Sequence, residues 1–178
     1  LLNKNKTDQR LRDSKKEDRY SASSSGQCSK KIWYEINHPE LKEPFSSRLL
    51  RTFRVGNIIG DDMDVGATLF FNKESGYKKY AEDYIKDDNL NIGGSFDLLL
   101  VDEIGYGYLY DYKTANIGSY AKIFGKNRTI GGTDGDHYRF QLGTYAYILL
   151  NNYKEKYNLI KIEYMALIGF DKNISNIA

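Results

Sequence analysis

The feature that most constrains the fold is a pair of strand-like segments within residues 92–116. The first contains the apolar run FDLLLV, a turn with glycines follows at EIGYG, and the second reads YLYDYKTA. Short apolar or alternating runs that flank a glycine-containing turn are typical of a β-hairpin. The sequence therefore predicts two antiparallel strands connected near residue 104.

This hairpin would bring chemically active side chains together. Asp97 and Asp111 are symmetric about residue 104, so antiparallel pairing sets them opposite each other, with Cβ atoms about 4.5–5.5 Å apart. Lys113 follows Asp111 by two residues, so its side chain leaves the strand on the same face. The alternating residues then point to the other face, toward helices: Tyr108, Tyr110 and Tyr112.

Two carboxylates at this separation repel each other unless a proton or a cation lies between them. Their oxygens suit a hard divalent cation, commonly Mg²⁺, with Mn²⁺ as a second candidate. The neighbouring lysine could neutralise charge on a phosphoryl group or orient a water molecule. Two alternatives stay open: an ordinary Asp–Lys ion pair at a strand end, and a one-residue register slip that separates the aspartates.

The rest of the chain indicates a mixed α/β domain. Residues 1–20 are rich in charge and predict a polar tail or an exposed helix, followed by one domain over residues 21–178. Helical spacing of apolar residues predicts helices at 21–36, with a serine N-cap, at 48–65, and at 137–153, capped by Asp134 or Asp136. Residues 73–86 fit a helix or a strand, 117–135 form a glycine-containing loop, and 161–170 predict a strand.

Composition excludes some classes of protein. The formal net charge of +2 does not by itself predict a nucleic-acid partner, and the single cysteine, Cys28, excludes an intrachain disulfide. No apolar run approaches the roughly 20 residues of a membrane span, so we expect a cytoplasmic protein without membrane contact. The chain lacks an initiator methionine and ends soon after a strand-like segment, which indicates C-terminal truncation.

Three ordered motifs, GGSFD, YDYKTA and QLGTYAY, give the sequence a family resemblance over residues 21–170. The chain resembles the PD-(D/E)XK nuclease superfamily, specifically its RecB-like exonuclease branch, whose pattern is G-x-x-D, D-x-K and Q-x-x-x-Y. The segment SASSSGQCSKKIWYE is similar to the N-terminal helix of that branch. The resemblance implies a restriction-endonuclease-like mixed central sheet flanked by helices, and a metal-dependent deoxyribonuclease, an exonuclease, that acts in phage or bacterial recombination, repair or host defence.

The resemblance also implies roles for individual residues. Asp97 and Asp111 would be metal ligands together with the backbone carbonyl of Tyr112, and Lys113 would be the catalytic lysine. Gln141 and Tyr145 share one face of their helix, because they are four residues apart. The resemblance implies that these two approach the active site and the DNA backbone.

The chain departs from the branch at one expected ligand. A helix of the form G-x-x-x-H supplies a histidine there, whereas the matching stretch GNIIG has Gly60 at that position. Asp61 or Asp62 could substitute, although each points about 100° further around the helix per residue. The site would then bind metal weakly or be inactive.

The cysteine, the two histidines and a group of basic residues allow only weaker predictions. Members of the branch with an iron–sulfur cluster carry three further cysteines, which are missing, so no cluster is expected and Cys28 is predicted to be a small buried residue. His38 and His137 are predicted to cap helices or lie on the surface. A basic and aromatic rim could contact DNA, with a solvated helix face as the equal alternative: Lys30, Lys31, Arg48, Arg51 and Arg54, with Trp33 or Tyr34.

Three functional hypotheses follow. The leading one is a Mg²⁺-dependent deoxyribonuclease. The second is a catalytically inactive nucleic-acid-binding module on the same fold, for which Gly60 is the main argument. The third is a sugar- or protein-binding domain in which the D-x-K motif occurs by chance.

Overall fold

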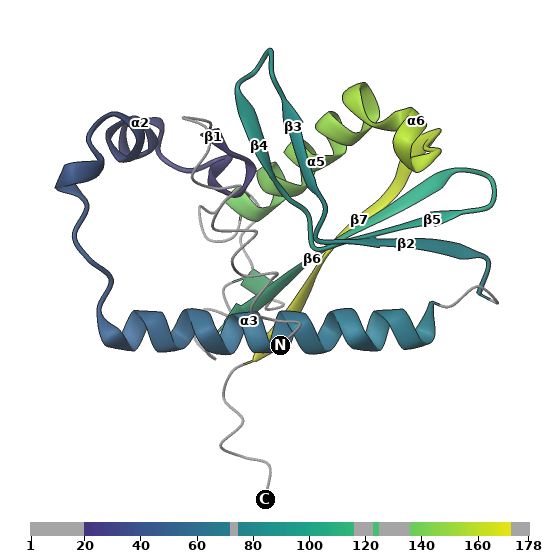
Figure 1. Cartoon of the computed structure of the whole chain (residues 1–178), viewed down its shortest axis with the longest axis horizontal. Coiled ribbons are helices and arrows are strands. Elements are labelled where there is room, and N and C mark those ends of the chain that lie inside the picture. The colour runs from purple at the N-terminus through teal and green to yellow at the C-terminus, as the bar shows by residue number, and fades with distance from the viewer. Residues whose placement is uncertain (1–19, 72–74, 116–122, 125–135, 172–178) are drawn as a thin grey trace, which may run out of the picture.

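The computed structural model describes residues 20–71, 75–115, 123–124 and 136–171 (Figure 1). Within these ranges the chain forms two mixed β-sheets flanked by helices. The predicted α/β class is therefore confirmed, and the described strands divide between two sheets; the restriction-endonuclease-like central sheet stays a prediction. Residues 1–19, most of the predicted loop at 117–135 and the Asp134 cap lie outside the described residues.

The larger sheet has four strands in the order β2-β5-β6-β7. Strands β2 (Tyr77–Ala81), β5 (Leu98–Asp102) and β6 (Tyr106–Ala115) pair antiparallel, and β7 (Lys161–Asp171) runs parallel to β6. The predicted strands within 92–116 and at 161–170 are thus confirmed. Of the segment 73–86, open between helix and strand, the described residues 75–86 contain strand β2 and most of β3 (Tyr84–Asp87).

The β5–β6 hairpin has the predicted register, since Leu98 pairs with Tyr110 and Leu100 with Tyr108. The Asp102 carboxylate organises the turn by accepting backbone N–H groups from Ile104, Gly105 and Tyr106 at 3.0, 2.9 and 2.8 Å. Gly105 has a φ of 98°, a conformation that side chains with a Cβ rarely adopt. The turn therefore depends on both Asp102 and Gly105.

Two long helices confirm the predicted helical segments. Helix α3 (Ser47–Phe70) has Ser46 as its N-cap, whose hydroxyl accepts the Leu49 N–H at 3.3 Å. Helix α5 (Asp136–Asn152) has Asp136 in its first turn, and the short α6 (Lys154–Tyr157) follows. Because β6 and β7 are parallel, the chain needs a crossover between them, and α5 forms its helical part.

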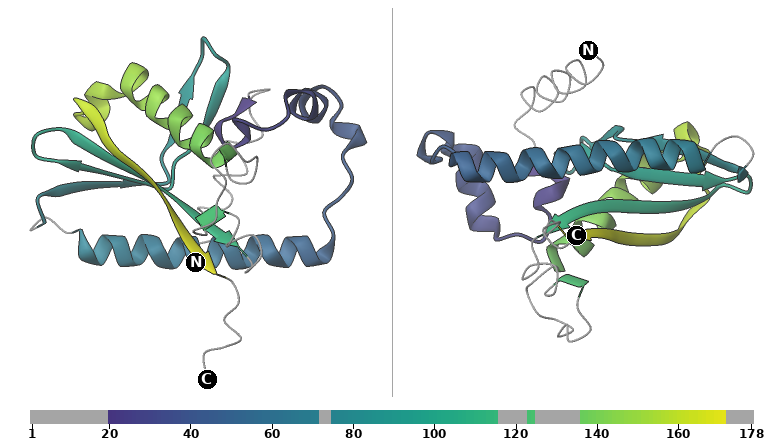
Figure 2. Two further views of the ribbon diagram at one scale, coloured as in Figure 1. Left: turned by 180° about the vertical axis from the view of Figure 1, so that it is seen from behind. Right: turned by 90° about the horizontal axis from the view of Figure 1, so that it is seen from below.

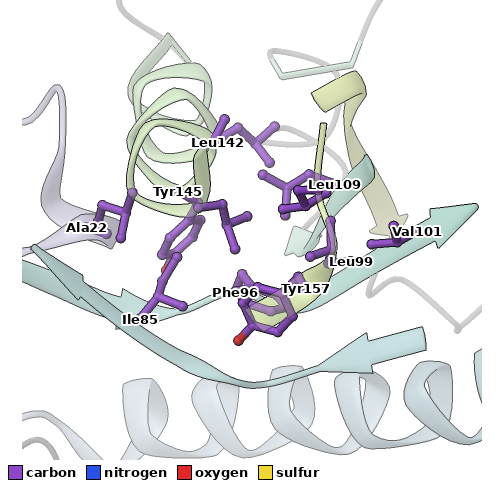
Figure 3. Close-up of a cluster of buried hydrophobic side chains, with 13 residues drawn as sticks. Ala22, Ile85, Phe96, Leu99, Val101, Leu109, Leu142, Tyr145 and Tyr157 are labelled. Atoms are coloured by element: carbon purple, nitrogen blue, oxygen red, sulfur yellow. The ribbon is translucent and has the colours of Figure 1, made fainter. Parts of the chain in front are cut away.

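The two helices contact different faces of the four-stranded sheet. Ala67 of α3 packs with Leu98, Leu100 and the alternating tyrosines of β6, as the two-residue period predicted. On the other face, Leu99, Val101 and Leu109 pack with Leu142, Ile148 and Leu149 of α5. Figure 3 shows this core, and Figure 2 shows α3 running along the sheet.

The second sheet has the order β1-β4-β3, with β1 (Tyr20–Ser21) parallel to β4 (Ile92–Ser95) and β3 (Tyr84–Asp87) antiparallel to it. It joins the same core as the larger sheet, because Ile85 and Tyr145 lie in one cluster with Leu99. The Tyr145 hydroxyl donates to the Ser95 carbonyl at 2.7 Å. Helix α5 therefore contacts both sheets.

The N-terminal helix differs from the prediction in two details. Helix α2 (Ser29–Asn37) follows the 3₁₀ turn η1 (Ala22–Ser24) and precedes η2 (Pro39–Leu41). Cys28, not a serine, stands at the N-cap and makes no side-chain cap hydrogen bond. Cys28 is exposed rather than buried, so that prediction is wrong, and α2 itself buries none of its residues. Among the described helices, none is long and apolar enough to cross a bilayer.

Candidate functional site

A cavity of about 600 Å³ lies where α3, the β5–β6 hairpin and the start of α5 meet. Helix α3 contributes Phe53, Gly56, Gly60 and Asp64 to its lining. The hairpin contributes Asp97, Tyr112 and Lys113, and α5 contributes His137, Tyr138 and Gln141. The cavity thus brings together most of the side chains that the sequence motifs singled out.

Asp97 and Asp111 adopt the predicted relation. Asp97 immediately precedes β5, and extending the observed pairing of Leu98 with Tyr110 by one residue sets Asp97 opposite Asp111. Asp97 Oδ2 accepts the backbone N–H of Tyr112 at 2.6 Å. This hydrogen bond fixes the Asp97 carboxylate just before the start of β5, where Asp97 lines the cavity.

Asp111 is the most deeply buried acidic group of the site, with 1% of its surface exposed. It lies just behind the cavity lining, where Gln141 Nε2 donates to Oδ1 at 2.8 Å and the Lys113 ammonium lies 2.6 Å from Oδ2. Burial raises the pKa of Asp111 to about 6; Lys113 opposes this shift, and the neighbouring Asp97 carboxylate adds to it. The lysine therefore does not fully compensate the burial of this carboxylate.

Lys113 links the buried carboxylate to the cavity. Its side chain is 19% exposed, and its ammonium lies 5.0 Å from the centre of the Tyr138 ring. An ammonium above an aromatic face gains roughly 0.5–2 kcal/mol, depending on its exposure to water. Lys113 is thus held between Asp111 and Tyr138, beside the open space of the cavity.

Gln141 and Tyr145 share a face of α5 as predicted, but they have different surroundings. Gln141 lines the cavity, whereas Tyr145 is buried in the core and does not. Burial raises the pKa of the Tyr145 hydroxyl, which donates to the Ser95 carbonyl. A direct contact between Tyr145 and a DNA backbone does not fit this position, so Tyr145 supports the site from behind.

Gly60 lies on the cavity wall, and the proposed substitutes for its missing side chain do not. Gly56, Gly60 and Asp64 are spaced by four residues and share the inner face of α3, which lines the cavity. Neither Asp61 nor Asp62 lines the cavity. Asp64 does line it and forms an ion pair with Lys79.

The predicted DNA-contacting rim is not part of this cavity. None of Lys30, Lys31, Trp33, Tyr34 and Arg51 is among the lining residues. Trp33 and Tyr34 pack edge to face with ring centres 5.1 Å apart on α2, and Lys31 pairs with Glu35. These contacts fit the alternative interpretation, a solvated helix face.

The lining residues that the sequence did not reveal as part of the site include Asp64, Glu82 and His137. The place of Asp64 in the lining could have been inferred from its spacing, because it follows Gly56 and Gly60 at steps of four residues. Glu82 stands between β2 and β3 with a φ of 55°, and its N–H donates to the Asp97 carbonyl at 3.2 Å; no local pattern marks it. His137, predicted to cap or lie on the surface, lines the cavity, and burial together with Lys113 lowers the pKa of its imidazole.

The donor set fits a hard divalent cation in part. Asp111 Oδ2 is buried and lies 2.6 Å from the Lys113 ammonium, and within the described residues it accepts no hydrogen bond of regular geometry. Such an oxygen next to a second carboxylate suits Mg²⁺, which keeps several waters and needs only one or two protein carboxylates. Over the same residues, no three His, Cys, Asp or Glu side chains gather around a point where an ion could bind.

Comparisons with protein-family models, curated proteins and solved structures give no match to this chain. The assignment of function therefore depends on the geometry of the cavity and on the sequence motifs alone.

Proposed function

We propose that the protein is a Mg²⁺-dependent deoxyribonuclease that hydrolyses phosphodiester bonds in this cavity, on a restriction-endonuclease-like fold. The observation that carries the proposal is the cluster of Asp97, Asp111 and Lys113 beside a cavity of about 600 Å³. The D-x-K and Q-x-x-x-Y motifs that resemble the RecB-like branch converge there through Lys113 and Gln141.

Energetics favour a functional role for this cluster over a purely structural one. Removing an ion pair from water costs several kcal/mol per charge, so a buried pair contributes little net stability. Here burial raises the pKa of Asp111 despite Lys113, which means that its charged form is less favoured in the fold than in water. Strongly perturbed carboxylates beside a cavity are typical of active sites.

The side chains of the cluster have distinct roles in the proposed reaction. Asp97 and Asp111 would hold the divalent ion, and the Tyr112 N–H and the Gln141 amide keep the two carboxylates in place. When bound, the ion supplies positive charge to the phosphoryl group and lowers the pKa of a water molecule. Lys113 would stabilise negative charge on the phosphate oxygens.

The inactive nucleic-acid-binding module remains the second candidate, and Gly60 favours it. The helix wall beside the cluster has no side chain at this position, and, apart from the helix's own backbone, no atom of the described residues lies within 4 Å of where a Cβ would be. Position 60 of α3 consequently supplies no side-chain ligand to the site. A histidine introduced there has room to reach into the cavity.

The test is digestion of end-labelled single- and double-stranded DNA with Mg²⁺ or Mn²⁺. We expect cleavage by the wild-type chain, and a loss of at least about 100-fold in Lys113→Ala, the size expected when one charge-stabilising group is removed. Lys161→Ala is the matched control, because Lys161 is also a strand lysine, paired with Glu163 outside the cavity. Mn²⁺ binding, followed by electron paramagnetic resonance, should weaken in Asp97→Asn.

The outcomes separate the two candidates. If only Gly60→His cuts DNA, the missing ligand explains the inactivity of the natural chain. Binding of DNA that weakens with salt, without cleavage by any variant, supports the binding module. If the chain neither cuts nor binds DNA and does not bind Mn²⁺, both candidates are wrong.

A further inference from the structure

Helix α3 exposes an apolar stripe on the side that faces away from the sheet. Its inner face contributes Ala67 to the core, the only residue of the helix that is buried. On its outer face, Val55, Ile58, Val65 and Leu69 are between 40% and 75% exposed. Figure 1 shows α3 along one border of the molecule.

The spacing of the stripe places it on one face of the helix. Residues 55, 58, 62, 65 and 69 alternate steps of three and four, so they follow one another along the same side of α3. Four of these five positions are apolar, and Asp62 is the exception. With 24 residues and a rise of about 1.5 Å per residue, α3 is about 36 Å long, enough for several turns of contact.

Charge is segregated along the same helix. All its basic residues, Arg48, Arg51 and Arg54, lie in the N-terminal half, and all its acidic ones, Asp61, Asp62 and Asp64, lie in the C-terminal half. This order opposes the helix dipole, which favours acids near the N-terminus and bases near the C-terminus. This order of charges therefore does not stabilise α3 as an isolated helix.

A second copy of the chain matches this pattern. We propose that the protein forms a two-fold symmetric dimer in which the outer faces of two α3 helices pack antiparallel. In such a pair the basic half of each helix meets the acidic half of the other. Two-fold symmetry makes every contact occur twice.

The symmetry also defines a register. Arg54, Ile58 and Asp62 are each four residues apart and lie on one row of the outer face. Their midpoint is Ile58, so placing the axis there pairs Arg54 of each copy with Asp62 of the other and buries Ile58 at the centre. Within the described part of the chain, neither Arg54 nor Asp62 forms an ion pair, so both are available for this contact.

The test uses charge reversal in the full-length chain, with molar mass measured by light scattering after size exclusion. The wild type is expected to be a dimer. Arg54→Asp and Asp62→Arg each create two like-charge pairs, so each variant alone should self-associate at least about 100-fold more weakly. Mixed together, the two variants should form a heterodimer, because every Asp at 54 then meets an Arg at 62 and every Arg at 54 meets an Asp.

Two further variants complete the experiment. Ile58→Lys should give a monomer, whereas Ile104→Lys, exposed in the β5–β6 turn, should leave the dimer intact. Circular dichroism confirms that each variant is folded. A monomeric wild type overturns the proposal, and the apolar stripe would then contact another segment of the chain or a different partner. A dimer that survives both single charge reversals, or a mixture that stays monomeric, overturns the antiparallel α3 contact.

Discussion

At the scale of single residues, Gly60 combines a local cost with a position beside the cavity. A glycine inside a helix is roughly 1 kcal/mol less favourable than alanine, and its surroundings offer no steric reason for the missing side chain. Gly107 is the opposite case, because a Cβ there would lie 2.7 Å from a Leu159 methyl and 2.9 Å from an Ile162 methyl. The two glycines therefore respond differently to the same substitution.

We predict that Gly60→Ala raises the free energy of unfolding by about 0.5–1 kcal/mol, since it removes backbone freedom from the unfolded chain and meets no clash. Gly107→Ala should lower it by about 1–3 kcal/mol through overpacking between β6 and β7. Urea titration monitored by circular dichroism measures both. A destabilised Gly60→Ala variant would mean that the open space at this position is occupied in solution.

At the scale of elements, aspartates organise two of the turns. Asp102 closes the β5–β6 turn, and Asp87 closes the β3–β4 turn by accepting the Leu90 N–H at 2.9 Å. Asp87 Oδ2 also accepts from the Asn152 side chain at 3.0 Å, which ties the hairpin to the end of α5. These hydrogen bonds, that of Leu90 first, lower the pKa of Asp87.

A lowered pKa gives Asp87 a pH-dependent contribution to stability. The charged form binds its donors in the folded state, so the stabilisation is present above the unfolded pKa of about 4 and is lost as pH falls through the lower folded pKa. We predict that Asp87→Asn lowers the melting temperature at pH 7, and that the difference from wild type closes below about pH 4. Asp88→Asn, at the exposed neighbouring position, is the control. A pH-independent difference would contradict this assignment.

Sequence patterns predicted the elements that depend on local periodicity. The two-residue period of β6 defined both the hairpin register and the tyrosine face that meets α3. The second sheet was missed, because the pairing of Tyr20 with Ile92 joins distant segments and has no local signal. Asp97, Asp111 and Lys113 could be grouped from one hairpin, but the α3 wall, Glu82 and His137 join them only through tertiary packing.

At the scale of the whole molecule, α5 connects the two sheets. Its buried side chains belong to a single core that includes Ile85 of β3 and Leu109 of β6. The same helix positions the Gln141 amide to donate to Asp111 and the Tyr145 hydroxyl to donate to the Ser95 carbonyl of β4. The stability of the core and the position of the candidate site thus depend on the same helix.

This arrangement predicts that the two sheets unfold together. Leu149→Ala removes a fully buried side chain of α5 and should lower the free energy of unfolding by about 2–5 kcal/mol. Tyr147→Ala, on the exposed side of the same helix, should change it by less than about 0.5 kcal/mol. Amide hydrogen exchange reports each sheet separately, and in Leu149→Ala the protection of β3–β4 and of β5–β6 should fall by the same factor. Loss of protection in only one sheet would show two independent units, with α5 anchored mainly to that sheet.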